Sequence, residues 1–315
     1  MDISRICIFG GTGFVGRSIV EQAYARGLGV RVVTAYPPKA MPITVVPTVE
    51  ILAGDVFDDS TLDRACEDMD AVVNLVGILH PSRGKGFDEV HVALPRRIAR
   101  ACHGAGVQHV VHMSALGADE KGPSEYQRSK ARGEAALRQA AGILPWTVFR
   151  PSVIFGEGDR FLNLFAALAK SFPVIPLAGA QARFQPVWVE DVARCFVEAV
   201  GETRAFGQVF PLCGPKAYTL AELVDFVART LGLQRRIWPL PPALARLQAA
   251  VLEHLPGKLM TRDNLASMSV DNTCDEPFPV LFGFKPTPLE AVAPLYLAGA
   301  STRERYQRYR HVAGR

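Results

Sequence analysis

The chain has 315 residues, enough to bury the core of one large α/β domain or of a domain that carries a smaller second lobe. It contains no apolar run of transmembrane length and no secretory leader pattern, so membrane spanning and export are disfavoured. Its six scattered cysteines form no CxxC pair, so reduced cysteines are expected rather than a disulfide framework. The net charge of +4 lies in residues 301–315, which hold five arginines and one glutamate, so the rest of the chain is neutral and no nucleic-acid partner is expected.

The first half of the chain alternates short runs rich in valine and isoleucine with helical stretches, the pattern of βαβ units. Strands are predicted over 3–9, 30–34, 49–53, 71–76, 108–113 and 146–150. Helices are predicted over 18–26, 60–66, 88–105 and 124–140. The predicted fold is therefore α/β, a Rossmann-type doubly wound parallel sheet.

The texture of the sequence changes beyond Pro151, where prolines and glycines become frequent. Short strand-like and helical pieces alternate there, at 182–189, 192–200, 208–212 and 220–231. This pattern predicts a smaller C-terminal α/β lobe for a substrate or partner. Because sheet strands are expected to continue past residue 151, we expect segments of the two lobes to interleave.

Three parts follow from this division. The expected parts are a first domain over 1–155, a smaller lobe over 156–300 and a basic C-terminal tail over 301–315. We expect the tail to be a solvated terminus. Contact with anionic lipid at a membrane surface, RNA or an acidic partner is the alternative.

A glycine-rich turn follows the first predicted strand and opens the first helix. Its residues are Gly10, Gly11, Thr12, Gly13, Phe14, Val15 and Gly16. Glycines at this spacing allow a tight turn, close approach of the backbone to a pyrophosphate, and close packing of helix on strand. The helix N-terminus adds unpaired N–H groups and the positive end of its dipole. The turn therefore predicts a site for NAD or NADP, with a merely flexible turn as the alternative.

The end of the second predicted strand distinguishes the two cofactors. An acid at this position would bind the 2′-hydroxyl of NAD and repel the 2′-phosphate of NADP, but no acid occurs between Glu21 and Glu50. The nearby cations are Arg17, Arg31 and Lys39, of which Arg17 directly follows the third glycine. NADP(H) is therefore favoured, and NAD(H) stays possible. The alternation of the strand could equally point Arg31 away from the cofactor.

Tyr126 and Lys130 lie four residues apart in the helix after the fifth predicted strand, on one face. The ammonium is expected to lower the pKa of the phenol, so that Tyr126 could exchange a proton with a carbonyl or hydroxyl group. Lys130 could also hold the nicotinamide ribose. Such pairs occur by chance on many helices, but their position after this strand favours the catalytic interpretation.

Taken together, these motifs resemble the extended or atypical short-chain dehydrogenases/reductases. The resemblance runs from residue 3 to about residue 298 and includes the glycine-rich turn, Gly54-Asp55-Val56, Tyr126xxxLys130, Arg150-Pro151 with Gly156, and Val189-Glu190-Asp191. The segments 112–118, 124–130 and 286–290 most resemble the nucleotide-binding accessory subunit of respiratory complex I and its bacterial relatives.

The resemblance implies a bound dinucleotide and a respiratory or quinone-related role. Besides the glycine-rich turn, the residues expected around the cofactor are Arg17, Thr34, Asp55, Val56, Asn74, Val76, Gly77, Lys130, Arg150 and Pro151. Asp55 could bind the adenine amino group or cap its own loop. Asn74 could line the cofactor or be buried with its amide hydrogen-bonded. The expected location is the cytoplasm, with peripheral binding to the inner membrane or to a membrane-bound respiratory complex as an option.

The expected carbonyl-binding serine is displaced by one position. Active members of the superfamily normally carry Ser or Thr at the tip of the fifth strand, where Ser114 is the candidate. Aligned without gaps, Ala115 occupies that position and Ser114 comes one residue early, so it would face the other side unless a bulge restores it. A bound cofactor is therefore predicted, and turnover is left open.

Two main functions of different classes remain, beside a weaker third one, an RNA- or DNA-associated factor that uses the basic tail. One is an NADP(H)-binding protein that docks on a membrane complex. The other is an oxidoreductase or epimerase in which Tyr126 is the acid/base, Lys130 tunes it and Ser114 holds the carbonyl. No metal site is expected, because His109 and His112 lack acids or cysteines at ligand spacing. The apolar segment 238–255 is expected to be core of the second lobe, with contact to a membrane-bound partner or lipid tail as the alternative.

Overall fold

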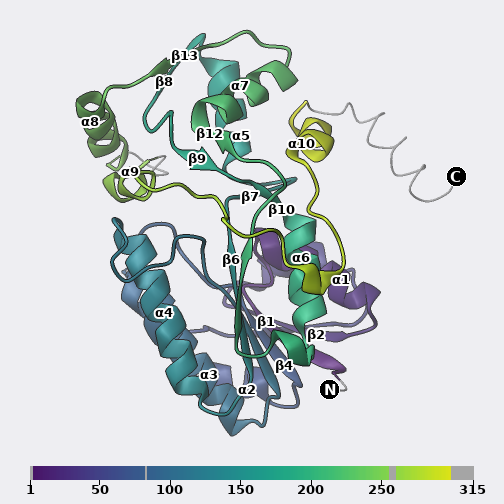
Figure 1. Cartoon of the computed structure of the whole chain (residues 1–315). Coiled ribbons are helices and arrows are strands. Elements are labelled where there is room, and N and C mark those ends of the chain that lie inside the picture. Colours follow the sequence, from purple (N-terminus) through teal and green to yellow (C-terminus); the bar gives the residue numbers. More distant parts are fainter. Residues whose placement is uncertain (1–2, 82–83, 255–259, 299–315) are drawn as a thin grey trace, which may run out of the picture.

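The structure, a computed structural model, describes residues 3–81, 84–254 and 260–298. Its centre is a seven-stranded sheet in the order β11-β6-β5-β4-β1-β2-β3, and every neighbouring pair is parallel. Figure 1 shows this sheet below a smaller second lobe. The predicted Rossmann-type doubly wound sheet is confirmed.

The bounds of the central elements agree closely with the sequence pattern. The strands are β1 (Arg5–Phe9), β2 (Gly29–Thr34), β3 (Val49–Ala53), β4 (Ala71–Asn74), β5 (His109–Met113), β6 (Trp146–Pro151) and β11 (Gln208–Leu212). The helices are α1 (Phe14–Ala25), α2 (Asp59–Cys66), α3 (Leu94–Gly104), α4 (Glu125–Ala141) and α6 (Val189–Ala199). Three shorter helices are η1 (Pro37–Ile43), η2 (Asp88–Ala93) and η3 (Thr203–Ala205), and η2 is a π-helix that directly precedes α3.

Both faces of the sheet are covered, which explains its near-continuous apolar strands. In β1, Ile6 and Ile8 point to a core shared with α1 and α6, whereas Cys7 and Phe9 point to a core shared with α2, α3 and α4. The strand order reverses at β1, which lies between β2 and β4. In open α/β sheets the carboxyl ends of the strands at such a point border the ligand crevice.

The second lobe has its own apolar core, which extends from Phe155 to Leu297. Its helices are α5 (Leu162–Ser171), α7 (Leu220–Thr230), α8 (Pro242–Leu252), α9 (Arg262–Ser267) and α10 (Leu289–Leu297). Its short strands pair two by two: β7 (Ile154–Phe155) with β10 (Val187–Trp188), β8 (Val174–Leu177) with β13 (Arg236–Pro239), and β9 (Arg183–Phe184) with β12 (Tyr218–Thr219). Figure 1 shows α8 and α9 on the opposite side of this lobe from α10.

Three segments beyond residue 155 return to the first domain. β11 pairs with β6 as the edge strand of the central sheet, and α6 packs against α1. The short helix η4 (Val280–Phe282) places Phe282 in the core shared with α1 and α6, with its ring centroid 5.7 Å from that of Phe149. The run 182–189, expected as one strand-like piece, instead forms β9 and β10, separated by Gln185 and Pro186. Proline lacks an amide N–H for a sheet ladder, which accounts for this break.

The expectation of reduced cysteines is wrong for one pair. A disulfide joins Cys213, directly after β11, to Cys274, with Cα atoms 6.1 Å apart. The two are 61 residues apart in sequence, so no local spacing indicates their contact. They meet because the chain returns alongside β9, where Gln185 N–H donates to the Asn272 carbonyl and Cys274 N–H donates to Gln185 Oε1. Cys7, Cys66, Cys102 and Cys195 are free and buried.

Among the described residues, no helix is both long and apolar enough to cross a bilayer. The basic tail predicted over 301–315 lies outside the described residues.

Candidate functional site

The glycine-rich turn joins the carboxyl end of β1 to the start of α1. Gly10 adopts a φ of +86°, which favours glycine, and the Gly13 N–H donates to the Gly10 carbonyl at 3.0 Å. A Cβ on Gly16 would collide with the Gly10 carbonyl oxygen, so the helix can start this close to the turn only with glycine there. No side chain caps α1 at Gly13, and its first turn carries no acid. These first N–H groups are therefore left for an anionic ligand.

The end of β2 and the loop after β3 lie next to the glycine-rich turn, because β2 pairs with both β1 and β3. Thr34 is buried, and its hydroxyl is used locally: it accepts from the Tyr36 N–H at 3.2 Å. Asp55 is exposed, and its Oδ1 accepts from the Phe57 N–H at 3.0 Å. This is the loop-capping role kept as an alternative in the sequence analysis. The bond to Phe57 uses only Oδ1 of Asp55, so the contact of this carboxylate with adenine stays a prediction.

The side chains of the three cations near the end of β2 point to different places. Arg17 is exposed at the turn, and its Nε donates to the Thr12 carbonyl at 3.2 Å. Arg31 points away, because its Nε lies 3.0 Å from Glu50 Oε2 and its Nη1 donates to the Glu67 carbonyl at 2.7 Å, beyond the end of α2. Lys39 is exposed in η1. Arg17 is thus the cation that lies against the glycine-rich turn itself.

Tyr126 and Lys130 share a face of α4, as predicted, next to the end of β5. Lys130 Nζ lies 6.0 Å from the centroid of the Tyr126 ring and donates to the Met113 carbonyl at 3.3 Å. The Tyr126 ring meets the ring of Phe87 edge-on, with centroids 6.1 Å apart, and that of His91, with centroids 5.7 Å apart. The ring of Tyr126 therefore packs against two other rings.

The electrostatics of this pair differ from the expectation. Burial raises the pKa of Tyr126 to about 12, whereas the spacing of the pair predicted that the ammonium would lower it. The physical reason is that burial acts on both groups. It also lowers the pKa of Lys130 to about 8, partly opposed by the charge of Glu134. In the protein alone, Tyr126 is a neutral hydroxyl that can donate a proton.

Ser114 directly follows β5 and is only 3% exposed. Its N–H donates to the Phe149 carbonyl at 2.7 Å, which fixes the backbone. Its Oγ is buried and has no hydrogen-bond partner in the part of the chain that the structure describes. A buried hydroxyl without a partner is costly, so this atom is available to a ligand that reaches it.

Asn74 ends β4, and the loop after it carries Val76 and Gly77. Asn74 is fully buried, its Nδ2 lies 3.1 Å from His112 Nδ1, and its Oδ1 accepts from the Val76 N–H at 3.1 Å. The amide therefore shapes the loop, as in the alternative given for it. Gly77 lies beside the lysine of the site, because a Cβ on it would be 3.2 Å from Lys130 Nζ.

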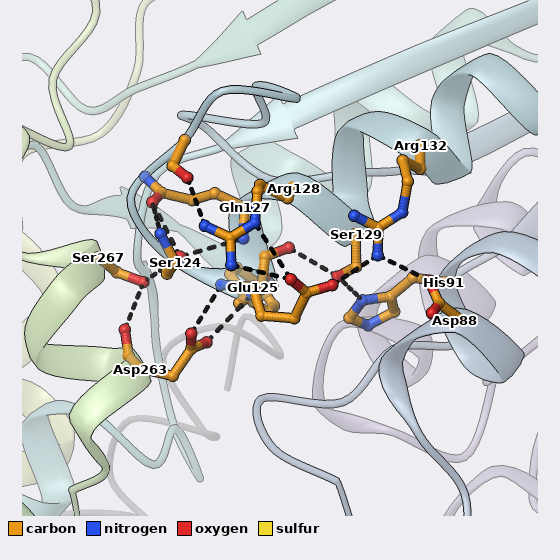
Figure 2. Close-up of polar contacts among 12 residues, drawn as sticks. Asp88, His91, Ser124, Glu125, Gln127, Arg128, Ser129, Arg132, Asp263 and Ser267 are labelled. Atoms are coloured by element: carbon orange, nitrogen blue, oxygen red, sulfur yellow. Dashed lines mark hydrogen bonds and ion pairs between the residues drawn. The ribbon is translucent and has the colours of Figure 1, made fainter.

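The first turn of α4 is held from two directions, as Figure 2 shows. Ser124 caps the helix in a capping box with Gln127, and its hydroxyl accepts from Ser267 Oγ at 2.8 Å. From α9, Asp263 accepts from the N–H groups of Glu125 at 2.7 Å and Tyr126 at 3.1 Å. The second lobe thus contacts the turn that carries Tyr126, which the sequence did not indicate.

Arg150 and Pro151, expected at the cofactor, end β6. The Arg150 guanidinium forms a two-point ion pair with Glu134, with Nε–Oε1 and Nη2–Oε2 distances of 2.8 Å each. Glu134 is 1% exposed and also binds Arg138 at 2.7 Å. Arg150 therefore ties β6 to α4, and its contact with a cofactor stays a prediction. The Pro151 carbonyl accepts from the Leu116 N–H at 2.9 Å.

An open pocket of 710 Å³ adjoins this site, a size typical of small-molecule sites. It lies between the loop after β4 and the α8–α9 region and is lined by Leu79, His80, Pro81, Phe87, Glu253, His254, Thr261, Arg262, Asp263 and Ala266. Two of these residues also contact the turn of Tyr126: Phe87 through its ring and Asp263 through its carboxylate.

Comparison with known proteins agrees with this geometry. A family model described as NAD(P)H-binding matches residues 10–170, a little more than half of the chain. The chain belongs to this NAD(P)H-binding family. Among its relatives is the mouse protein named NADH dehydrogenase [ubiquinone] 1 alpha subcomplex subunit 9, mitochondrial, which is 32% identical over 298 residues, 90% of this chain and 77% of the relative.

Other members and neighbours are reductases by name. The ceramide reductase of Caulobacter vibrioides is 31% identical over 238 residues, 75% of this chain and 73% of the relative. The NADPH-dependent quinone oxidoreductase of Escherichia coli, solved with NADPH, has a TM-score of 0.75 at 20% identity, covering 92% of this chain and 99% of that one. At this identity the likeness shows the fold alone. The resemblance to short-chain dehydrogenases and to the complex I accessory subunit is confirmed.

The residues of the site fit the dinucleotide of this NAD(P)H-binding family. The uncapped start of α1 suits a pyrophosphate, and the buried Lys130 lies beside Gly77 and the Met113 carbonyl, where β4 and β5 end. Ser114, whose buried Oγ has no partner among the described residues, directly follows β5. His91 and Asp263 are the contributors that sequence reasoning missed. The signal for His91 was its place, three residues before Leu94 and seven before Ile98, on the buried face of a helical stretch.

Proposed function

We propose that this chain binds NADP(H) in preference to NAD(H). We also propose that it is the nucleotide-binding component of a respiratory assembly, like the NADH dehydrogenase [ubiquinone] that its relatives are named after. The observation that carries the preference is the end of β2. No acidic side chain follows Thr34 before Glu50, and Glu50 pairs with Arg5 and Arg31 instead. Arg17, exposed at the glycine-rich turn, is the cation available for a 2′-phosphate.

Each end of the crevice has its own role in this proposal. The first N–H groups of α1 bind the pyrophosphate, and Asp55 receives the adenine amino group through its second carboxylate oxygen. Lys130 donates to the ribose at the nicotinamide end, and Ser114 Oγ, which has no partner among the described residues, forms a hydrogen bond with the ligand.

A titration with NADPH and NADH tests the preference. We expect tighter binding of NADPH, and we expect Arg17→Gln to weaken NADPH about tenfold while leaving NADH unchanged, because a charge-assisted hydrogen bond to the 2′-phosphate is lost. Arg26→Gln is the matched control, since Arg26 caps the far end of the same helix. Tighter binding of NADH by the wild type would overturn the preference.

The respiratory association is tested separately. Native electrophoresis of mildly solubilised membranes from the source cells should show part of the chain migrating with an NADH dehydrogenase activity band. Migration only at the size of the free chain, under conditions that keep that complex intact, counts against the association and leaves nucleotide binding untouched.

An active reductase is the second candidate, favoured by Tyr126 and Lys130, which share a face of α4 next to the end of β5, and by Ser114, which directly follows that strand. Bound NADPH would supply a hydride to a carbonyl carbon. Ser114 Oγ would hold the carbonyl oxygen, and Tyr126, neutral at physiological pH, would donate the proton that completes the alcohol. The pocket beside Phe87 and Asp263 is the space that such a substrate would enter.

Turnover is measured on a panel of ketones, aldehydes and quinones with NADPH. Under this second candidate Tyr126→Phe keeps NADPH affinity and loses turnover by a factor of about one hundred or more, the usual contribution of a proton donor. No wild-type turnover across the panel, with NADPH still bound, supports the binding function alone.

A further inference from the structure

His91 joins two elements of the site and belongs to no motif of the sequence. It lies in η2, is 2% exposed, and its ring stacks on that of Phe87 with centroids 5.4 Å apart. Its Nε2 accepts from the Ile78 N–H at 3.1 Å, and its Nδ1 lies 2.9 Å from Ser129 Oγ. The imidazole therefore bridges the loop after β4 to α4, and Figure 2 shows its contact with Ser129.

The direction of these hydrogen bonds follows from the backbone donor. Because the Ile78 amide can only donate, Nε2 is the acceptor and the ring proton lies on Nδ1. Nδ1–H then donates to Ser129 Oγ, whose hydroxyl donates to the Tyr126 carbonyl at 2.8 Å. Burial and the charge of Lys130 lower the pKa of His91 to about 2, so the imidazole stays neutral in this arrangement.

Two glycines let these elements approach so closely. A Cβ on Gly77 would lie 3.2 Å from Lys130 Nζ and 3.5 Å from His91 Nε2. A Cβ on Gly133 would collide with the His91 carbonyl oxygen, so η2 can pack on α4 only because residue 133 lacks a side chain. The loop at Gly77 is thus held by the hydrogen bond from Ile78 to His91, and Gly77 lies next to Lys130.

We propose that His91 is a positioning residue for the dinucleotide: by holding the Ile78 amide, it sets the distance between the Gly77 loop and the Lys130 face of α4. The inference rests on the nucleotide site proposed above, since the carboxyl end of β4 borders the crevice where dinucleotides bind in a doubly wound sheet. The π-helical form of η2 agrees with this role, because single π-turns are frequent at functional sites.

His109 offers a matched control with the same kind of network. It is fully buried, its Nδ1 accepts from the Gly201 N–H at 3.4 Å, and its Nε2 lies 3.0 Å from Thr147 Oγ1. That hydroxyl in turn donates to the Ala205 carbonyl at 2.6 Å. His109 begins β5, at the amino-terminal edge of the sheet, so its network is far from the crevice.

The test compares NADPH affinities, read from the fluorescence of the bound nucleotide, across four variants. In His91→Gln the amide oxygen can take the place of Nε2 and accept from Ile78, whereas the shorter side chain of His91→Asn can only reach the Ser129 side. We expect His91→Phe and His91→Asn to weaken the Kd about tenfold and His91→Gln to stay within roughly threefold of wild type. His109→Phe should lower the thermal midpoint without changing the Kd.

The outcomes separate positioning from stability. An unchanged Kd in His91→Phe, an equal weakening in His109→Phe, or a glutamine variant no better than the asparagine variant each overturns the inference. If His91→Phe does not fold, the Gln–Asn pair makes the same comparison. A wild type that binds neither NADPH nor NADH overturns the proposed function and this inference together, whereas binding that is insensitive to His91 overturns the inference alone.

Discussion

At the glycine-rich turn the candidate site is formed by backbone, whereas at the first turns of α4 it is formed by polar side chains. The first region depends on the absence of a Cβ at Gly16 and on helix N–H groups that no side chain caps. The second depends on His91, Lys130 and Asp263, whose partners come from three separate stretches of the chain. A backbone site is specified locally, and a side-chain site is specified by the fold. The two regions should therefore fail in different ways.

Lowering the pH should have the largest effect on the free energy of unfolding, because the folded protein keeps buried histidines neutral, among them His91 beside α4. Burial lowers the pKa of His91 to about 2, of His112 to about 3 and of His109 to about 4, from 6.5. Below about pH 6.5 the unfolded chain takes up protons that the folded chain does not, so stability falls as the pH falls. With three such groups the free energy of unfolding should drop by up to about 4 kcal/mol per pH unit between pH 6.5 and 5.

Urea denaturation at a series of pH values across this window measures the slope. His109→Gln should remove about one third of it without affecting nucleotide binding. A free energy of unfolding that is flat down to pH 5 would show that these side chains are not held neutral in the folded protein.

Replacement of Lys130 should have the next largest effect. It should stabilise the fold although it weakens nucleotide binding. Burial lowers the pKa of Lys130 from 10.5 to about 8, so the folded protein holds this proton less well than the unfolded chain and gains stability as the pH rises from 8 to 10.5. Lys130→Met should therefore be more stable than wild type at neutral pH, by up to about 3 kcal/mol, and bind NADPH less well.

Thermal midpoints from pH 7 to pH 10.5 check this prediction. The advantage of Lys130→Met should shrink steadily above pH 8. A constant difference between variant and wild type over this range would contradict the assignment of a buried, destabilised ammonium.

Gly16→Ala tests the backbone region. The new methyl group must push α1 away from the Gly10 carbonyl, which moves the N–H groups that bind the pyrophosphate. Overpacking of this kind costs about 1–3 kcal/mol, so NADPH affinity should fall by as much as about a hundredfold. Gly104→Ala is the control, because a Cβ there meets nothing within 4 Å, and calorimetric titration should find its affinity unchanged.

Asp263→Ala should give the smallest effect. It removes the carboxylate that accepts from the Glu125 and Tyr126 N–H groups, while the Ser124 capping box stays intact. Loss of a helix cap costs about 1 kcal/mol, measurable by urea denaturation. Asp225→Ala, which removes only an exposed ion pair on α7, should cost less than about 0.5 kcal/mol. Equal losses in the two variants would mean that α9 does not hold α4.

Much of the fold could be predicted because its signals are local. The alternation of strands and helices indicated six of the seven central strands in order, and residues 208–212 were expected as a strand. Their place beside β6 was not, because the pairing joins residues about 60 apart and no local pattern encodes it. The same holds for the disulfide between Cys213 and Cys274.

The site divides in the same way. The glycine-rich turn and the Tyr126–Lys130 pair are fixed by spacing within one turn or one helix face, so sequence sufficed. His91 meets Ser129 across 38 residues, and Asp263 meets Tyr126 across 137. The pKa of Tyr126 was mispredicted for a related reason: the spacing indicates a nearby charge, but burial, which dominates here, depends on the packed aromatic neighbours.

The position of β11 has a consequence for how the chain is made. During synthesis β6 emerges long before its neighbour, and until residue 212 has left the ribosome β6 is an unprotected edge with unpaired N–H and C=O groups. α6, which covers α1, also arrives late. The nucleotide-binding half therefore cannot close around its core until two thirds of the protein has been translated. A fragment that stops at residue 155 should aggregate rather than bind nucleotide.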